Sequence, residues 1–382
     1  MALPHYFGLF QYVWQCFVGP CNKARSTSVK LLLATVLATL VAPLLLAAGT
    51  LDFYTIDVEG GKSVLIVSPA GKSMLIDVGW PASPDRSASV DRIVEAVKAA
   101  GLTKLDYVLI SHFDGDHVGD LPQLASKVPI GRVLDHGEFH PAPPPATPDP
   151  RYTASLNAAM ERFKAYDETR TKIGHTVVKP GDKIPLKGVD VEVVAAGNQF
   201  IRKPLKGAGA PNPLCAMNPQ AAVIERDVED NQSVGVVFIF GKFRMLDLAD
   251  LEAHFSRDLV CPNNLIGTVS AYHVNVHGQF KGIAPELIGA VHPQVAIMGN
   301  GARKGADPPT WPLLRATPGL EDIWQVHYSN AGTKETNPPS DFIANPDEPD
   351  EFKMIRLSAQ SDGTFAVTNT RNGFSKTYKS VK

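Results

Sequence analysis

A short loop rich in metal-binding side chains is the feature that most restricts the fold of this chain. The ten residues Ser111–Asp120 follow an apolar run, Leu105–Ile110. Five of the ten carry an imidazole or a carboxylate: His112, Asp114, Asp116, His117 and Asp120. A strand that runs into a compact turn lets alternate side chains converge on one point. The pattern therefore favours a metal-binding loop after a strand over a polar loop with capping aspartates.

Strands and helices alternate around this loop, which predicts a layered α/β domain. Short apolar runs joined by turns predict strands at 54–58, 64–67, 74–76 and 105–110, with a helix from Ser83-Pro84 to Gly101. The same rhythm returns later in the chain. Further strands are expected at 190–194, 234–240, 243–248, 265–270, 294–298, 353–358 and 364–368, and further helices at 156–166, from 251 and at 285–291.

Residues 50–382 are interpreted as a single domain with insertions at 136–150 and 197–230. The first insertion contains six prolines, and the second is rich in Gly, Pro and Asn without a period. Long segments of this kind often border a functional site.

Residues 1–49 are interpreted as a signal peptide or a signal anchor. Residues 31–48 are 18 uncharged residues that follow Lys23, Arg25 and Lys30 and end in small side chains. Pro43 favours cleavage, although 18 apolar residues are also enough to span a bilayer. The aromatic lead before them indicates that translation starts at Val29. The protein is expected to be secreted or periplasmic, or anchored in the membrane by residues 31–48 if they are retained.

The charge of the mature chain excludes a strongly basic nucleic-acid binder. Without residues 1–49, 34 basic side chains stand against 39 acidic ones, a net charge of -5, and Arg202, Lys203 and Lys206 are a small basic cluster. Only Cys215 and Cys261 would remain, outside any Cys-x-x-Cys pattern. The sequence is compatible with a disulfide between these two cysteines and equally with two free thiols.

The metal-binding loop resembles the His-x-His-x-Asp-His motif of the metallo-β-lactamase superfamily. Asp114 replaces the second histidine and Ser111 precedes the first, which resembles the hydrolase domain of the bacterial competence protein ComEC. Segments 56–63, 75–79, 230–233 and 246–250 also resemble that family. The resemblance implies an αββα sandwich, with two mixed β-sheets packed face to face and helices outside.

The resemblance also implies the ligands of two metal ions. The loop would supply His112, Asp114, Asp116 and His117. Asp250 would be the carboxylate that bridges the two ions. The alternative interpretation is that Asp250 caps the N-terminus of the next helix. His277 in Val276-His277-Gly278-Gln279 would be the last ligand, with His273 as the substitute.

One position of the superfamily pattern has no histidine here. Superfamily members usually supply a third histidine before the strand at 234–240, and Asp230 is the most suitable replacement in Glu229-Asp230-Asn231. His136 and His140 lie in a Pro-rich loop, where solvated imidazoles are expected, and are not assigned to the site.

Two divalent ions in such a site would hold a bridging hydroxide. Asp116 would either orient that hydroxide or bind the second metal. The excess of carboxylates makes Mn or Fe a competitor of Zn. The prediction is an exported metal-dependent hydrolase of a small or short phosphodiester or other phosphoester. The alternatives are a lactam, lactone or carboxylic ester hydrolase, and a non-catalytic binding module that has lost its metal. The residues that bind substrate and the oligomeric state are not predicted.

Overall fold

Two nine-stranded mixed β-sheets form the centre of the computed structural model, which describes residues 49–83, 89–141, 143–147, 149–216, 228–347 and 352–380. The first sheet contains β1 (Leu51–Thr55), β2 (Val64–Val67), β3 (Ser73–Ile76), β4 (Tyr107–Leu109), β5 (Val133–Asp135), β6 (His175–Val177), β16 (Ile355–Ala359), β17 (Thr364–Asn369) and β18 (Ser375–Lys379). The second contains β7 (Lys183–Ile184), β8 (Asp190–Ala196), β9 (Gln199–Phe200), β10 (Gly235–Phe240), β11 (Phe243–Asp247), β12 (Ala271–His273), β13 (Val295–Met298), β14 (Asp322–His327) and β15 (Ile343–Asn345).

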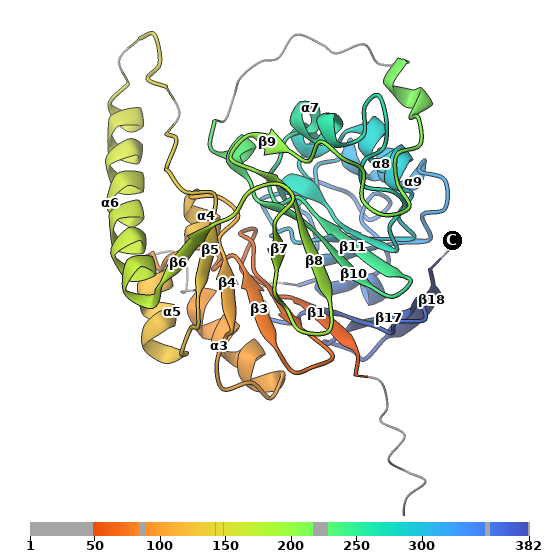
Figure 1. Cartoon of the computed structure of the whole chain (residues 1–382), viewed down its shortest axis with the longest axis horizontal. Coiled ribbons are helices and arrows are strands. Elements are labelled where there is room, and N and C mark those ends of the chain that lie inside the picture. The colour runs from red at the N-terminus through yellow and green to blue at the C-terminus, as the bar shows by residue number, and fades with distance from the viewer. Residues whose placement is uncertain are drawn as a thin grey trace, which may run out of the picture. The chain divides into compact units, whose positions relative to one another are not determined.

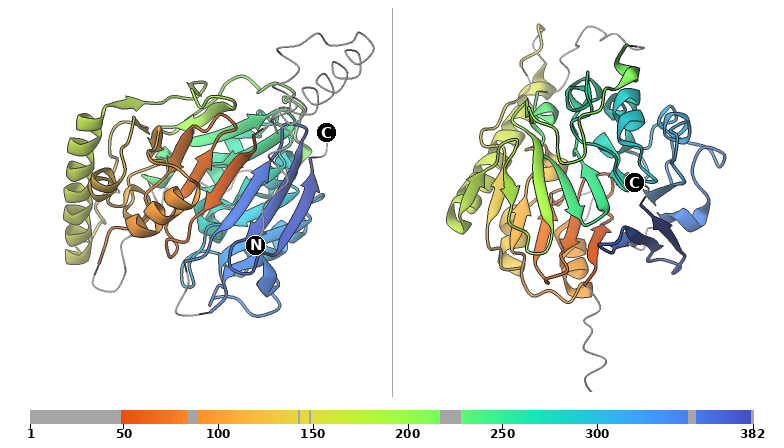
Figure 2. Two further views of the ribbon diagram at one scale, coloured as in Figure 1. Left: turned by 90° about the horizontal axis from the view of Figure 1, so that it is seen from below. Right: turned by 45° about the vertical axis from the view of Figure 1, so that its right-hand side comes forward.

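Each sheet combines an antiparallel and a parallel half. The first runs in the order β18-β17-β16-β1-β2-β3-β4-β5-β6 and is parallel from β3 to β6. The second runs β15-β14-β13-β12-β11-β10-β8-β7 and is parallel from β11 to β15. Figure 2 shows the C-terminal strands, in blue, continuing the sheet of the N-terminal strands.

The hydrophobic core between the sheets follows from the two-residue period of the strands. In β2, Val64 and Ile66 face the inter-sheet core, whereas Leu65 faces the helices of the first sheet. In β10 of the second sheet, Val236 faces the inter-sheet core and Val237 faces the helices outside. Both faces of these two strands are therefore apolar, as the centre of a sheet covered on both sides requires.

Helices cover the outer face of each sheet (Figure 1). On the first sheet lie α3 (Ser89–Ala99), α4 (Gly115–Val118), α5 (Leu121–Lys127) and α6 (Pro150–Ile173). On the second lie α7 (Ala253–Ser256), α8 (Pro285–Val291) and α9 (Thr310–Arg315). These layers confirm the predicted αββα sandwich.

The long helix α6 is fastened to the first sheet at one end. The Tyr166 hydroxyl donates to Asp135 Oδ2 at 2.6 Å, and Arg170 Nη1 donates to the same oxygen at 2.7 Å. Asp135 ends β5 and is fully buried. The buried network therefore fixes α6 beside the loop that follows β4.

Several predicted elements are displaced. The first strand spans Leu51–Thr55 instead of 54–58, and the predicted strand at 265–270 is wrong. Leu265, Ile266 and Val269 pack as loop residues against the outer core of the second sheet, and the strand β12 follows them. An apolar run marks burial but does not by itself distinguish strand from loop.

The second insertion is tied to the rest of the fold by a disulfide. Cys215 and Cys261 are joined in the structure, which decides between the two states left open by the sequence. None of the helices among the described residues is long and apolar enough to cross a membrane. The segment 31–48 lies outside the described residues.

Candidate metal centre

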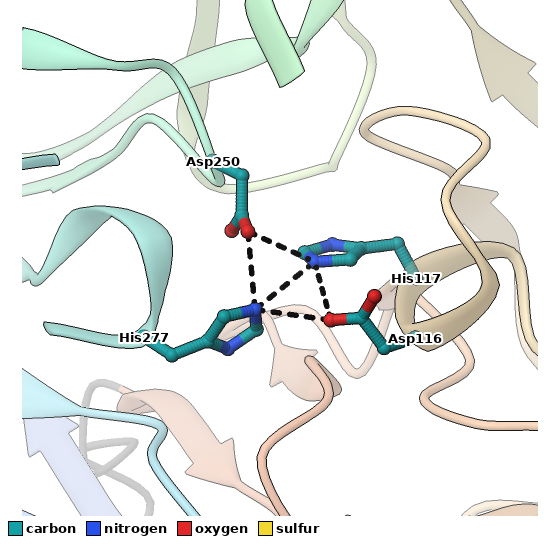
Figure 3. A group of neighbouring side chains, drawn as sticks. All are labelled: Asp116, His117, Asp250 and His277. Atoms are coloured by element: carbon teal, nitrogen blue, oxygen red, sulfur yellow. Dashed lines mark hydrogen bonds and ion pairs between the residues drawn. The ribbon is translucent and has the colours of Figure 1, made fainter. Parts of the chain in front are cut away.

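Four buried side chains from three segments converge on one point (Figure 3). Asp116 and His117 belong to α4, Asp250 follows β11, and His277 lies in the short 3-10 helix Asn275–Gly278. His277 Nε2 lies 3.1 Å from Asp116 Oδ2 and 3.1 Å from Asp250 Oδ2. His117 Nε2 lies 3.3 and 3.4 Å from the same two oxygens. One ligand atom from each residue lies within 4.8 Å of the others.

The outer nitrogens of the two histidines determine what the inner ones can do. His117 Nδ1 lies 2.9 Å from Asp77 Oδ2, and His277 Nδ1 lies 3.2 Å from the carbonyl oxygen of Gly299. Both partners are acceptors, so each Nδ1 carries the hydrogen. In the neutral imidazoles both Nε2 atoms then present lone pairs, and they face each other at 3.2 Å. Two lone pairs and two carboxylates around one point form a donor set that fits a divalent metal ion.

Tight turns present Asp250 and His277 to this point. Asp247 Oδ1 accepts a hydrogen bond from the Ala249 backbone N–H at 2.9 Å, and Ala249 has φ of +50°. Val276 and His277 also have positive φ, at +50° and +55°. Such conformations cost of order 1–3 kcal/mol each and concentrate at functional sites. Asp250 is not a helix cap, because α7 begins at Ala253 with Glu252 at its N-cap position.

A second group lies beside the first and contains His112, Asp114 and Asp230. The His112 and His117 rings are 4.0 Å apart between centroids. His112 Nε2 has no hydrogen-bond partner and lies 3.5 Å from Asp230 Oδ1 and 3.9 Å from Asp114 Oδ2. This buried nitrogen and the two nearby carboxylates together form the donor set of a second metal position.

Glu229, beside Asp230, holds the two loops of this second group together. Its Oε1 accepts from the Phe113 backbone N–H at 2.8 Å and from His136 Nε2 at 2.9 Å. Its Oε2 accepts from the His140 backbone N–H at 2.8 Å. The expectation of a solvated His136 is wrong, because its imidazole is buried against Glu229. Its role is to position the loop that carries Asp230.

Lys62 connects the first sheet to the second inside the site. Its backbone N–H donates to the Asp116 carbonyl at 3.0 Å, and its ammonium lies 2.9 Å from both Asp247 Oδ1 and His273 Nδ1. An ammonium has only donors, so His273 Nδ1 is the acceptor. Burial and the charge of Lys62 lower the pKa of His273 to about 3. Neither of the two ligand groups among the described residues includes His273, so the geometry favours His277 over His273.

The two histidines of the loop hold protons tightly when no metal is bound. Burial and His117 lower the pKa of His112, but Asp230, Asp114 and Asp250 outweigh them and raise it from 6.5 to about 9. Burial also opposes the charge on His117, yet Asp250, Asp116 and Asp77 raise its pKa well above the usual range. Against burial, His277 and His117 hold the pKa of Asp250 well below its usual range.

Metal binding is therefore expected to release protons. The raised pKa of His112 stabilises the metal-free fold fully below about pH 6.5, and this contribution is lost as the pH rises through about 9. A metal must displace the same proton, so its affinity should rise with pH across this window. Titration calorimetry in two buffers of different ionisation enthalpy measures the released protons. Equal heats in both buffers and an affinity independent of pH would contradict the assignment of His112.

The replacement Asp77→Asn tests the orientation of His117. Asp77 is fully buried, has φ of +61°, and also accepts from the Ser111 backbone N–H and hydroxyl at 2.7 Å each. The neutral amide should bind His117 less strongly and weaken metal affinity about 10- to 100-fold. Competition with a chromogenic chelator measures this loss. Ser63→Ala is the control, because the Ser63 hydroxyl donates to the Asp77 carbonyl oxygen rather than to its carboxylate.

The structure thus brings seven predicted residues into two adjacent groups: His112, Asp114, Asp230, Asp116, His117, Asp250 and His277. The sequence interpretation missed Asp77, Glu229 and Lys62 as supporting residues. Asp77 lies in segment 75–79, whose resemblance to the family was the one signal available for it. Glu229 and Lys62 act on partners far away in the sequence.

Comparisons with known proteins give one family match and several similar structures. Residues 56–205 match the family model described as Metallo-beta-lactamase superfamily. No curated protein matches the sequence. The metallo-beta-lactamase fold protein YhfI from Bacillus subtilis is 12% identical, with a TM-score of 0.42 over 72% of this chain and 95% of that chain. The novel metallo hydrolase Igni18 from Ignicoccus hospitalis is 13% identical, with a TM-score of 0.39 over 72% and 94%.

A third similar structure is CmlA, a diiron beta-hydroxylase from Streptomyces venezuelae. It is 13% identical, with a TM-score of 0.33 over 70% of this chain and 47% of that chain. The matched family model and the two groups of ligand-type side chains together support a metallo-hydrolase. Over residues 56–205 the chain therefore matches the metallo-beta-lactamase superfamily.

Proposed function

We propose that this protein is an exported hydrolase that uses two divalent metal ions to cleave a phosphodiester or a related phosphoester. The observation that carries the proposal is the meeting of His117 and His277, whose inner nitrogens face two buried carboxylates. The group of His112, Asp114 and Asp230 lies directly beside it. Adjacent metal positions of this kind suit displacement at phosphorus or at a carbonyl carbon.

When bound, the two ions would activate water and neutralise charge on the oxygens of the substrate. The residues of the chain would hold the ions and control protons. Burial opposes ionisation of Asp116, but His117 and Lys304 keep its pKa well below the usual range. Asp116 is therefore an anion at neutral pH and can accept a hydrogen bond from the attacking water. Asp77 keeps the hydrogen of His117 on Nδ1, away from the ions.

The composition of the ligand set supports a phosphoester over a lactam. Four carboxylates and three imidazoles make up the two groups, and Asp114 stands where the superfamily motif has a second histidine. Oxygen-rich sites favour harder ions, so Mn or Fe is proposed beside Zn. The resemblance of this loop to the ComEC-type domain points in the same direction. A net charge of -5 for residues 50–382 favours a small or short substrate over long nucleic acid.

Metal analysis combined with a substrate screen tests the proposal. We expect close to two equivalents of metal after gentle purification, and turnover of bis(4-nitrophenyl) phosphate with Zn²⁺, Mn²⁺ or Fe²⁺ supplied. Nitrocefin and a lactone are the parallel substrates. Turnover of these two but not of the phosphodiester would establish the carboxylic ester or lactam alternative. Less than about one equivalent of metal, with no turnover, would establish a non-catalytic binding module.

Export is supported by the disulfide Cys215–Cys261, because disulfides persist in oxidising compartments. Residues 31–48 have the composition of a signal segment. N-terminal sequencing of the protein recovered from the periplasm or medium should find a start close to residue 50. Recovery in the membrane fraction with residues 31–48 intact would instead establish an anchor, and recovery in the cytoplasm would contradict export.

A further inference from the structure

Two lysines form ion pairs with carboxylates of the metal centre. Each of the two ligand groups contributes one of these carboxylates. The Lys304 ammonium pairs with Asp116 Oδ2, and the Lys281 ammonium pairs with Asp230 Oδ2. Their side chains are 30% and 37% exposed, whereas the two carboxylates are nearly buried. Both ammonium groups therefore lie between the ligands and solvent, where a substrate must approach.

Arg162 approaches the same loop from α6. A Cβ added to Gly115 would lie 3.2 Å from Arg162 Nη2 and 3.3 Å from its Cζ, so the guanidinium rests on the glycine backbone. Gly115 separates Asp114 from Asp116 and thereby the two ligand groups. The buried Arg162 Nε has no hydrogen-bond partner, and no ion pair involves Arg162 within the described part of the chain.

Metal binding would change the partners of the two lysines. Two divalent ions would take up the four carboxylates of the ligand groups, among them Asp230 and Asp116, which pair with Lys281 and Lys304 in the structure. Glu252 Oε1, 3.3 Å from the Lys281 ammonium, offsets the charge of that lysine. A guanidinium presents a planar fork of donors that fits a phosphate, and charged hydrogen bonds in a partly buried site are strong.

We propose that Arg162, Lys281 and Lys304 form an anion-binding rim, and that the substrate carries a second phosphate beside the phosphodiester that is cleaved. Lys281 and Lys304 contact the non-bridging oxygens of the cleaved group. Arg162 contacts the neighbouring phosphate. This inference rests on the proposed phosphodiesterase function and names its substrate class: a short phosphodiester with an additional phosphate.

A pair of dinucleotides that differ only in a 5′-phosphate tests the rim on the metal-loaded protein. The 5′-phosphate should lower KM about tenfold for the natural sequence, and Arg162→Gln should remove this advantage. Lys281→Gln and Lys304→Gln should raise KM about tenfold for both dinucleotides. Lys164→Gln, an exposed charge on the same helix, is the matched control and should change neither value. Metal content is measured for every variant.

Calorimetric binding of inorganic pyrophosphate and inorganic phosphate to the metal-loaded protein is the readout independent of turnover. Pyrophosphate should bind about tenfold more tightly, and Arg162→Gln should abolish this preference. Cleavage of both dinucleotides with equal KM would overturn the rim and leave the proposed reaction standing. A preference for pyrophosphate that depends on Arg162, without cleavage of any phosphodiester, would support the rim and overturn the reaction. Equal binding of the two anions would overturn the rim.

Discussion

Replacement of Asp250 by alanine is expected to lower hydrolysis more than about 100-fold and to reduce bound metal by at least one equivalent. Loss of a supporting partner already costs 10- to 100-fold, and Asp250 is placed as a direct ligand. Its Oδ2 lies 3.1 Å from His277 Nε2 and 3.4 Å from His117 Nε2. Metal analysis and steady-state kinetics of the purified variant measure both effects.

The metal-free Asp250→Ala protein should also be less stable, by about 3 kcal/mol, because a buried charged group loses its partner. Denaturant unfolding in the presence of a chelator measures this loss. Asp258→Ala is the control, since Asp258 is an exposed carboxylate close by in the sequence. An Asp250→Ala variant that kept full metal content and activity would remove Asp250 from the ligand set.

Replacement of His277 by alanine should affect activity and metal binding, whereas replacement of His273 by alanine should affect stability. His277→Ala removes a direct ligand and is expected to lower activity more than about 100-fold with loss of metal. His273→Ala should keep the metal but lower the free energy of unfolding by about 1–3 kcal/mol, because the buried Lys62 ammonium loses an acceptor.

The variant His273→Gln separates these two roles. A glutamine oxygen can still accept from Lys62, so His273→Gln should recover part of the lost stability. Metal analysis, kinetics and denaturant unfolding of the three variants provide the comparison. If His277→Ala remained active while His273→Ala and His273→Gln both lost metal, the two histidines would exchange roles.

Residues close together in the sequence were the easiest part of the site to predict. His112, Asp114, Asp116 and His117 lie within one turn after β4, so their convergence follows from local geometry. Asp230, Asp250 and His277 could be named only through the resemblance to a family. Their separation from the loop is too long for any local rule to place them beside it.

The strands were predicted where they alternate or form short apolar runs, and were missed where they do not. The edge strand β18 reads Ser-Lys-Thr-Tyr-Lys, with only Tyr378 buried, so its sequence resembles a polar tail. Strand β17 pairs with β18 in an antiparallel hairpin and provides its backbone hydrogen-bond partners. Pairing with a neighbour, which the sequence of β18 does not encode, makes this segment a strand.

The sequence by itself determined the layered α/β class, the metal-binding loop and the side chains able to bind metal. Only the tertiary structure decided which atoms meet and in which protonation state. His117 directs Nε2 to the other ligands because the Asp77 carboxylate occupies its other nitrogen, and His273 cannot present Nδ1 because the Lys62 ammonium occupies it. Hydrogen bonds between distant segments set the tautomer of an imidazole, and they form only when the sheets have packed.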